Sequence, residues 1–229
     1  MSLARLMSVV AVVSAAFVAP GIATASSIKI SDGISTLIIN DQDFVPGPGN
    51  PIDMDSTAGI VYYKGSVGSN WTFTVTTGFT KPDFGSATDP EMHLGVQASS
   101  KGAGTLTVWF SETSFGPSGT LLDASISSNG GATTYKTYQG VGLFDTATSL
   151  TTSSLLAGAY SVTDITSLSS AVGPYSLTQK VTLTHTVKGV SSFDATLSVP
   201  DGGTTLSLLG LGLLGIVGMG RLTRPSRVE

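Results

Sequence analysis

Between positions 26 and 199 the chain alternates apolar side chains with threonine and serine. The clearest stretch, residues 71–76, reads Trp-Thr-Phe-Thr-Val-Thr. Successive side chains of a strand point to opposite faces, so a period of two indicates a strand with one buried face and one solvent-exposed face. The pattern predicts that the apolar residues of this stretch enter a core, while its threonines, Thr76 included, face solvent.

The same alternation recurs at 181–187 and 193–199, and turn-forming residues separate many short segments of this kind. At 128–131 the sequence Ser-Asn-Gly-Gly readily supplies the positive backbone angles of a tight turn, which predicts a β-hairpin between the flanking segments. We therefore expect an all-β fold, an antiparallel β-sandwich or jelly-roll-like single domain over 26–199. Its helical content should be small and lie near 150–157.

The first 25 residues have the layout of a secretory signal peptide. A basic residue, Arg5, precedes an apolar stretch, and Pro-Gly then leads to the small side chains of Ala23 and Ala25. Small residues at these two places suit the narrow pockets of signal peptidase. We predict that residues 1–25 direct export and are cleaved off after Ala25.

The other end of the chain is also apolar. Residues 204–220 form a Gly/Leu-rich segment of about 17 residues, the lower limit for a helix that crosses a bilayer. Arg221 and Arg224 follow in the basic tail 221–229. Basic residues stay on the cytoplasmic side, so we predict a short transmembrane helix with the preceding domain outside the cytoplasm.

A motif joins the body to this apolar segment and consists of Val199, Pro200, Asp201, Gly202 and Gly203. Followed by a Gly/Leu helix and then by arginines, it resembles the PEP-CTERM class of C-terminal sorting signals, in its VPDSG-CTERM variant. The resemblance implies that residues 200–229 are a sorting signal handled by an exosortase, an integral membrane cysteine protease or transpeptidase. It also implies an exported protein associated with extracellular polysaccharide or biofilm. The sequence between the two ends resembles no family that we recognise.

Charge and cysteine content narrow the function classes. Residues 26–199 contain seven lysines, no arginine and thirteen acidic residues. This acidic, arginine-free body lacks the basic footprint that nucleic acids require, so we expect no nucleic-acid partner. The chain has no cysteine, which excludes disulfides and thiolate chemistry and makes it the substrate of an exosortase rather than the enzyme.

Four aspartates bracket a Pro/Gly-rich loop: Asp41, Asp43, Asp53 and Asp55. Carboxylates from the two arms of such a loop can supply the hard oxygen ligands that Ca²⁺ takes, although the spacing is not that of an EF-hand. The alternative is that these residues only form turns and keep the loop soluble. Apart from this Ca²⁺ site, the sequence predicts no cofactor.

One aromatic residue stands out on the polar side of a predicted strand. In residues 105–110 the alternation turns Leu106, Val108 and Phe110 inward and leaves Trp109 among threonines. An exposed indole can stack on a sugar ring, which makes Trp109 a candidate carbohydrate-binding residue. The alternative is that a loop covers it.

Catalytic machinery is poorly represented in the body. We expect His185 to be a hydrogen-bonded core or rim residue and His93 to face solvent, and no Gly-x-Ser-x-Gly elbow accompanies them. Glu91 and Glu112 are the only glutamates of the body, and we assign them structural or surface roles. The sequence therefore argues against an enzyme.

Together these features predict an exported structural or adhesive protein of the cell surface or extracellular matrix. Its processing partners would be signal peptidase and an exosortase, and the inner membrane would hold it transiently. A carbohydrate-binding module for the cell's own exopolysaccharide is the main alternative, and a secreted hydrolase is the third.

Overall fold

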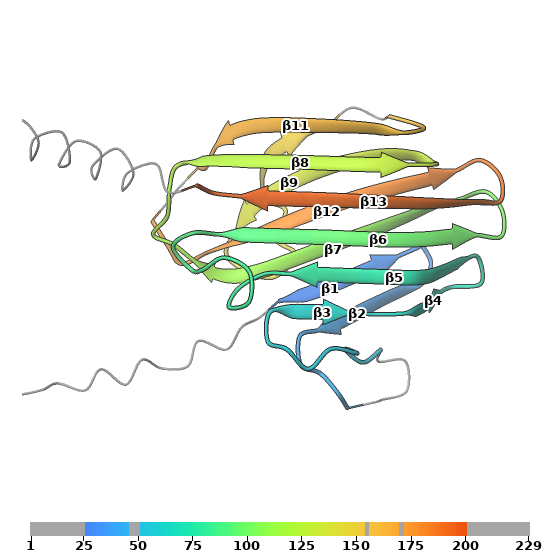
Figure 1. Ribbon diagram of the computed structural model, residues 1–229, viewed down its shortest axis with the longest axis horizontal. Helices are drawn as coiled ribbons and strands as arrows, with labels where there is room; N and C mark the ends of the chain where they lie inside the picture. The colour runs from blue at the N-terminus through green and yellow to red at the C-terminus, as the bar shows by residue number, and fades with distance from the viewer. Residues whose placement is uncertain (1–25, 46–50, 154–155, 170–171, 201–229) are drawn as a thin grey trace, which may run out of the picture.

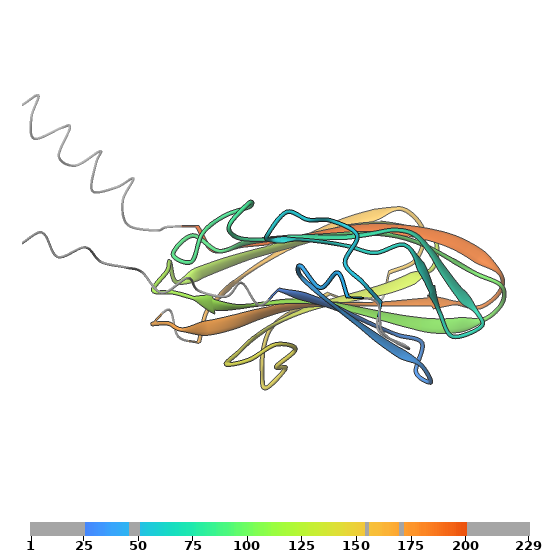
Figure 2. The same cartoon turned by 90° about the horizontal axis from the view of Figure 1, so that it is seen from below.

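The computed structural model describes residues 26–45, 51–153, 156–169 and 172–200. Within these residues the chain forms thirteen strands in two antiparallel sheets that pack face to face (Figures 1 and 2). The prediction of an antiparallel β-sandwich is confirmed.

The six-stranded sheet has the order β10-β9-β12-β7-β1-β2. Its strands are β1 (Ser27–Ser31), β2 (Thr36–Asn40), β7 (Gly104–Phe115), β9 (Ala132–Gly140), β10 (Thr148–Thr152) and β12 (Tyr175–His185). The central pair, β7 and β12, has nine consecutive residue pairs in one register, from Leu177 to His185 of β12, so this sheet has a long middle.

The seven-stranded sheet has the order β11-β8-β13-β6-β5-β3, with β4 paired to β5 beside β3. Its strands are β3 (Ile60–Tyr62), β4 (Gly65–Val67), β5 (Trp71–Phe79), β6 (Glu91–Ser100), β8 (Leu121–Asn129), β11 (Tyr160–Ser167) and β13 (Gly189–Ser198).

The chain passes repeatedly from one sheet to the other, as it does from β6 to β7, from β7 to β8 and from β12 to β13. This changes one expectation. The turn near Gly130 exists, with a positive φ of 110° at that glycine, but β8 and β9 pair with different neighbours. The predicted hairpin is therefore wrong: the turn carries the chain between the two sheets.

The core lies between the inner faces of the sheets, where the alternation placed it. Val181 and Leu183 of β12 and Phe193 and Leu197 of β13 are almost fully buried. Trp71 and Phe73 of β5 are buried as predicted.

Thr76 is fully buried, contrary to the prediction that it faces solvent. The pairing of β5 with β6 shifts register between Phe73 and Val75. An irregularity of this kind inserts an extra residue into one strand and reverses the facing of the residues that follow. The β5 threonines therefore do not all share one face.

The expected helix near 150–157 is also wrong. Its described residues include the strand β10, where the hydroxyl of Thr151 hydrogen-bonds that of Thr137 on β9 at 2.7 Å, and Leu156 forms a bridge with Thr133. The β-branched threonines of β10 favour a strand, and the edge of the sheet offers them a partner.

The residues that the structure describes contain no helix that is long and apolar enough to span a membrane. The predicted signal peptide, 1–25, with Ala23 and Ala25, and the predicted membrane helix, 204–220, lie outside the described residues.

Candidate functional site

Trp109 lies near the middle of β7 on the outer face of the six-stranded sheet. Its neighbours Val108 and Phe110 are fully buried, whereas Trp109 is half-buried, as the alternation predicts. The side chain is therefore neither free in solvent nor hidden in the core. What surrounds it decides whether it can contact a ligand.

Two lysines flank the indole from the neighbouring strands. Lys29 of β1 and Lys180 of β12 are the cross-strand partners of Trp109, and their Nζ atoms lie 4.3 Å and 5.3 Å from the centre of its ring. Lys180 is in turn opposite Lys136 of β9. We call these four residues, Lys29, Trp109, Lys180 and Lys136, the lysine–tryptophan row.

The row carries positive charge without a local counterion. Among the described residues, no carboxylate lies within 4.0 Å of Lys29, Lys136 or Lys180, and the salt bridges there involve other residues. Partial burial lowers the pKa of Lys29, and the nearby charge of Lys180 lowers it further. These lysines therefore repel one another.

A second aromatic residue borders the row. The loop 141–147 brings the ring of Phe144 to 4.6 Å from Nζ of Lys29, and the backbone N–H of Phe144 donates to Oγ of Ser111 at 3.0 Å. In Figure 2 the segment after β9 projects from the outer side of the sheet. Asp145 in this loop accepts hydrogen bonds from the N–H groups of Val141 and Ala147, which lower its pKa.

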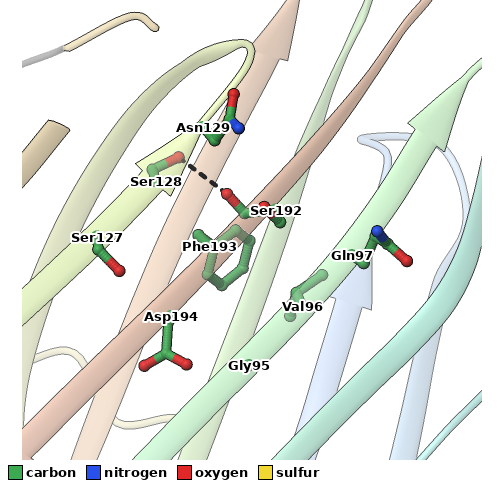
Figure 3. Close-up of a pocket in the computed structure, with 9 residues that line it drawn as sticks. All are labelled: Gly95, Val96, Gln97, Ser127, Ser128, Asn129, Ser192, Phe193 and Asp194. Carbon is green, nitrogen blue, oxygen red and sulfur yellow. Dashed lines mark hydrogen bonds between the residues drawn. The ribbon is translucent and has the colours of Figure 1, made fainter. Parts of the chain in front are cut away.

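The outer face of the seven-stranded sheet has a shallow hollow of 570 Å³. Figure 3 shows its polar lining on three adjacent strands, with Ser127 and Asn129 on β8, Asp194 on β13 and Gln97 on β6. Gly95 of β6 has no side chain to fill the space beside Asp194. The hollow therefore offers hydroxyl, amide and carboxylate groups.

His93 of β6 lies at the edge of this hollow, and its side chain contacts other residues. Its Nε2 is 2.7 Å from Oδ1 of Asp194, and the ring packs on Phe79 with centroids 5.6 Å apart. Its side chain is 26% exposed, so the expectation that His93 faces solvent holds only in part. The pairing with Asp194 was not foreseen because these residues lie 101 positions apart in the chain.

His185 is buried at the end of β12, as predicted. One ring nitrogen is 2.7 Å from the hydroxyl of Ser100 on β6, and the other is 2.7 Å from that of Ser191 on β13. Trp71 packs on the ring at 4.9 Å between centroids. A neutral imidazole donates through one nitrogen and accepts through the other, so both hydroxyls are satisfied and the two sheets are joined.

A serine beside a histidine is also the basis of nucleophilic catalysis. His185 borders a hollow of 400 Å³ with Gly131 and Gly189. Ser100 and Ser191 are each only 3% exposed, however, and no described carboxylate orients the imidazole by a hydrogen bond. Burial lowers the pKa of His185 and favours its neutral form.

The four aspartates of the predicted Ca²⁺ site accept hydrogen bonds from backbone N–H groups of nearby residues. Asp53 is buried and accepts hydrogen bonds from three backbone N–H groups, those of Gln42, Asp55 and Tyr62. Burial raises its pKa, while these bonds act against the rise.

The remaining three also accept backbone hydrogen bonds: Asp41 from Gly59, Asp43 from Val45 and Asp55 from Thr57. In the described part of the chain, no three acidic or histidine side chains are grouped as metal ligands would be. These backbone hydrogen bonds favour the turn-forming role of the four aspartates, and the Ca²⁺ site stays untested.

Sequence reasoning missed one buried ion pair. Glu112 of β7 is fully buried, and its Oε1 receives hydrogen bonds from Nζ of Lys81 at 3.0 Å and from the N–H of Thr113 at 2.7 Å. Lys81 precedes β6 by ten positions and gives no sequence signal of burial. Glu91 lies half-buried at the start of β6.

The C-terminal segment, which begins at the end of the β-sandwich, matches a known type of sorting signal. Residues 198–221 match the sequence profile of the VPDSG-CTERM motif. The chain carries this type of sorting signal. The signal indicates export. The resemblance of the C-terminal segment to a VPDSG-CTERM sorting signal is confirmed.

Only the start of the VPDSG-CTERM motif belongs to the described residues. Val199 is fully buried, and its N–H donates to the carbonyl of Pro90 at 2.9 Å; Pro200 follows in solvent. The rest of the predicted processing residues, Asp201, Gly202, Gly203, Arg221 and Arg224, lie outside the described part. The sorting signal thus begins directly at the folded body.

Two solved structures are similar to the chain at low sequence identity. The K1 cleaved adhesin domain of Lys-gingipain from Porphyromonas gingivalis W83 has 10% identity and a TM-score of 0.33, over 62% of this chain and 99% of that one. The K3 cleaved adhesin domain of the same protein has 12% identity and a TM-score of 0.27, over 76% and 98%. No curated protein matches the chain significantly in sequence.

Proposed function

We propose that this protein is exported, is held transiently in the inner membrane through residues 204–220, and reaches the cell surface or extracellular matrix after action by an exosortase. There its β-sandwich acts as an adhesive, non-enzymatic module that binds extracellular polysaccharide. The VPDSG-CTERM motif at 198–221 supports the destination. The observation that carries the adhesive role is the half-exposed indole of Trp109 on a broad sheet face.

The physical basis is the shape and chemistry of a sheet face. Aromatic rings contribute a large apolar surface for the C–H face of a sugar, and surrounding hydroxyl groups can hydrogen-bond its substituents. β7 and β12 place Thr107 and Thr182 directly beside each other, two residues along from the Trp109–Lys180 pair. The outer face thus offers stacking and hydrogen bonding without a deep cleft.

Intact-mass measurement of the mature protein from its native host tests the route. We expect a chain that begins at Ser26 and ends near Pro200. A mass that includes residues 221–229 would show a retained anchor, and a cytosolic location would contradict the proposal.

Retention on polysaccharide from the native host tests adhesion. Trp109→Ala should lower retention several-fold, because a lost aromatic contact costs about 0.5–1.5 kcal/mol of binding free energy. The matched control is Phe84→Ala, which removes an aromatic side chain that is 39% exposed elsewhere. Equal weak retention of the parent and of Trp109→Ala would remove the carbohydrate-binding role.

The hydrolase alternative rests on the serines beside His185. A fluorophosphonate probe labels a serine that a histidine activates and that solvent can reach. Because Ser100 and Ser191 are buried, we expect no labelling of the folded protein. Labelling that His185→Gln abolishes would favour the hydrolase instead.

A further inference from the structure

The lysine–tryptophan row collects lysines that are distant in sequence. Positions 29, 136 and 180 supply three of the seven lysines of residues 26–199, and strand register brings them to one line across β1, β7, β12 and β9. Three strand spacings of about 4.8 Å make this line about 14 Å long. It is long enough to contact more than one sugar ring.

This placement is unfavourable for the sheet alone. Lys136 and Lys180 are directly opposite on neighbouring strands, and like charges in that position destabilise a sheet. The alternation of apolar and polar residues requires only a polar residue at these two positions, not a lysine. An anion bound between Lys136 and Lys180 would offset the repulsion between their charges.

The rows on either side of the lysine–tryptophan row contain no carboxylate. One consists of Ser31, Thr107, Thr182 and Thr134, and the other of Ser27, Ser111, Thr178 and Tyr138. The second of these rows is buried, so the hydroxyl groups that a ligand can reach beside the lysines are those of the first row. The lysines give this face a positive charge, although residues 26–199 have six more acidic than basic residues. Charge is segregated onto this face.

The aromatic groups narrow the chemistry of the anion. Lys29 lies between the rings of Trp109 and Phe144, at 4.3 Å and 4.6 Å from their centres. An ammonium group over a ring occupies the surface that a neutral sugar would use, and a cation–π contact holds it there. An acidic group on the ligand would draw the ammonium toward itself and leave the indole to the sugar ring.

We propose that the lysine–tryptophan row binds acidic polysaccharide, with Lys29, Lys180 and Lys136 pairing with carboxylate or sulfate groups along the chain and Trp109 stacking on a sugar ring. This inference rests on the proposed adhesive function and names its ligand class. Trp109 stands within the row, between Lys29 and Lys180, and offers an apolar face to a sugar ring, whereas a double-stranded nucleic acid keeps its bases stacked inside the duplex. The indole thus favours a sugar acid over a double-stranded nucleic acid.

The test compares polymers that differ in charge alone. The protein, purified from a host that exports it, is titrated with polygalacturonate and with its fully methyl-esterified form, and with dextran sulfate and dextran. Double-stranded DNA is a further arm. We expect both acidic polymers to bind at least about tenfold more tightly than their neutral partners, with a log–log salt slope of about −2 for three neutralised lysines.

Two variants locate the binding. Lys29→Gln/Lys180→Gln should weaken polygalacturonate binding about tenfold, or about 1.4 kcal/mol, because two half-buried ion contacts are lost. Removing the repulsion should leave the thermal midpoint unchanged or raised, which separates lost binding from lost folding. The control Lys64→Gln/Lys101→Gln makes the same charge change at exposed positions outside the row and should retain binding within about twofold.

The outcomes separate this inference from the proposed function. Equal binding of the esterified and acidic polymers, or equal losses in both double variants, overturns selection for acid and leaves adhesion intact. Tighter binding to DNA overturns it in favour of a nucleic acid. Retention on neither these polymers nor the native polysaccharide overturns both.

Discussion

The buried pair of Lys81 and Glu112 gives a sharp test of what stabilises the sandwich. Lys81→Met keeps most of the side-chain volume and removes the charge. In the parent, Oε1 of Glu112 receives hydrogen bonds from Lys81 and from the N–H of Thr113, whereas Oε2 has no hydrogen-bond partner among the described residues. The variant would leave a carboxylate in the core with one hydrogen bond.

The magnitude follows from this geometry. Burial raises the pKa of Glu112, and the charge of Lys81 acts against the rise. Breaking a buried ion pair from one side costs about 3–5 kcal/mol because the remaining charge is uncompensated. Replacing both partners, as Lys81→Met/Glu112→Leu does, should return the free energy of unfolding to within about 1 kcal/mol of the parent or above it.

The loss should depend on pH. Without Lys81, the folded-state pKa of Glu112 lies further above its unfolded value, so the folded state binds the proton more tightly. Stability of Lys81→Met is then greatest below the unfolded pKa of about 4.3 and is lost as pH rises through the folded pKa. The difference from the parent should therefore be larger at neutral pH than in acid.

Urea unfolding followed by tryptophan fluorescence measures these differences. Lys180→Met is the matched control, because this half-buried lysine has no described carboxylate within 4.0 Å and its loss should cost under about 1 kcal/mol. If Lys81→Met is as stable as the control, or if the double variant is as unstable as the single one, the buried pair does not stabilise the fold in this way.

Three further predictions concern buried polar groups. Burial lowers the pKa of His185, so folding stability should be present above pH about 6.5 and fall below it, by at most about 1.4 kcal/mol per pH unit; His185→Gln should flatten this part of the Tm-against-pH curve, and a parent curve without that slope would contradict it. The hydroxyl of Thr76 is buried without a described partner, so Thr76→Val should raise the free energy of unfolding in urea by up to about 1 kcal/mol, and a loss would show that the hydroxyl is bonded. Asp53→Ala should cost about 3 kcal/mol in urea unfolding by leaving three amides unpaired. Ca²⁺ should leave the Tm of the parent and of Asp53→Ala unchanged; a rise in the parent that Asp53→Ala lacks would establish the cation site.

Strand content and strand facing could be predicted from the sequence because they depend on local periodicity. Alternation placed Phe110 and Leu183 inside and Trp109 outside without knowledge of any partner strand. The rule failed where pairing intervened. Thr76 is buried because β5 shifts register against β6, and β8 and β9 separate because each finds its partners in a different sheet.

The sequence by itself determined the all-β class, the apolar face of most strands and the C-terminal sorting motif, since each is written in residues that are near one another in the chain. Only the tertiary structure decided which side chains meet. Lys29, Trp109, Lys136 and Lys180 form one row because four strands pair in a particular register, and Lys81 reaches Glu112 across 31 positions. Pairing between distant strands is set by the packing of the whole core, so local pattern carries no information about it.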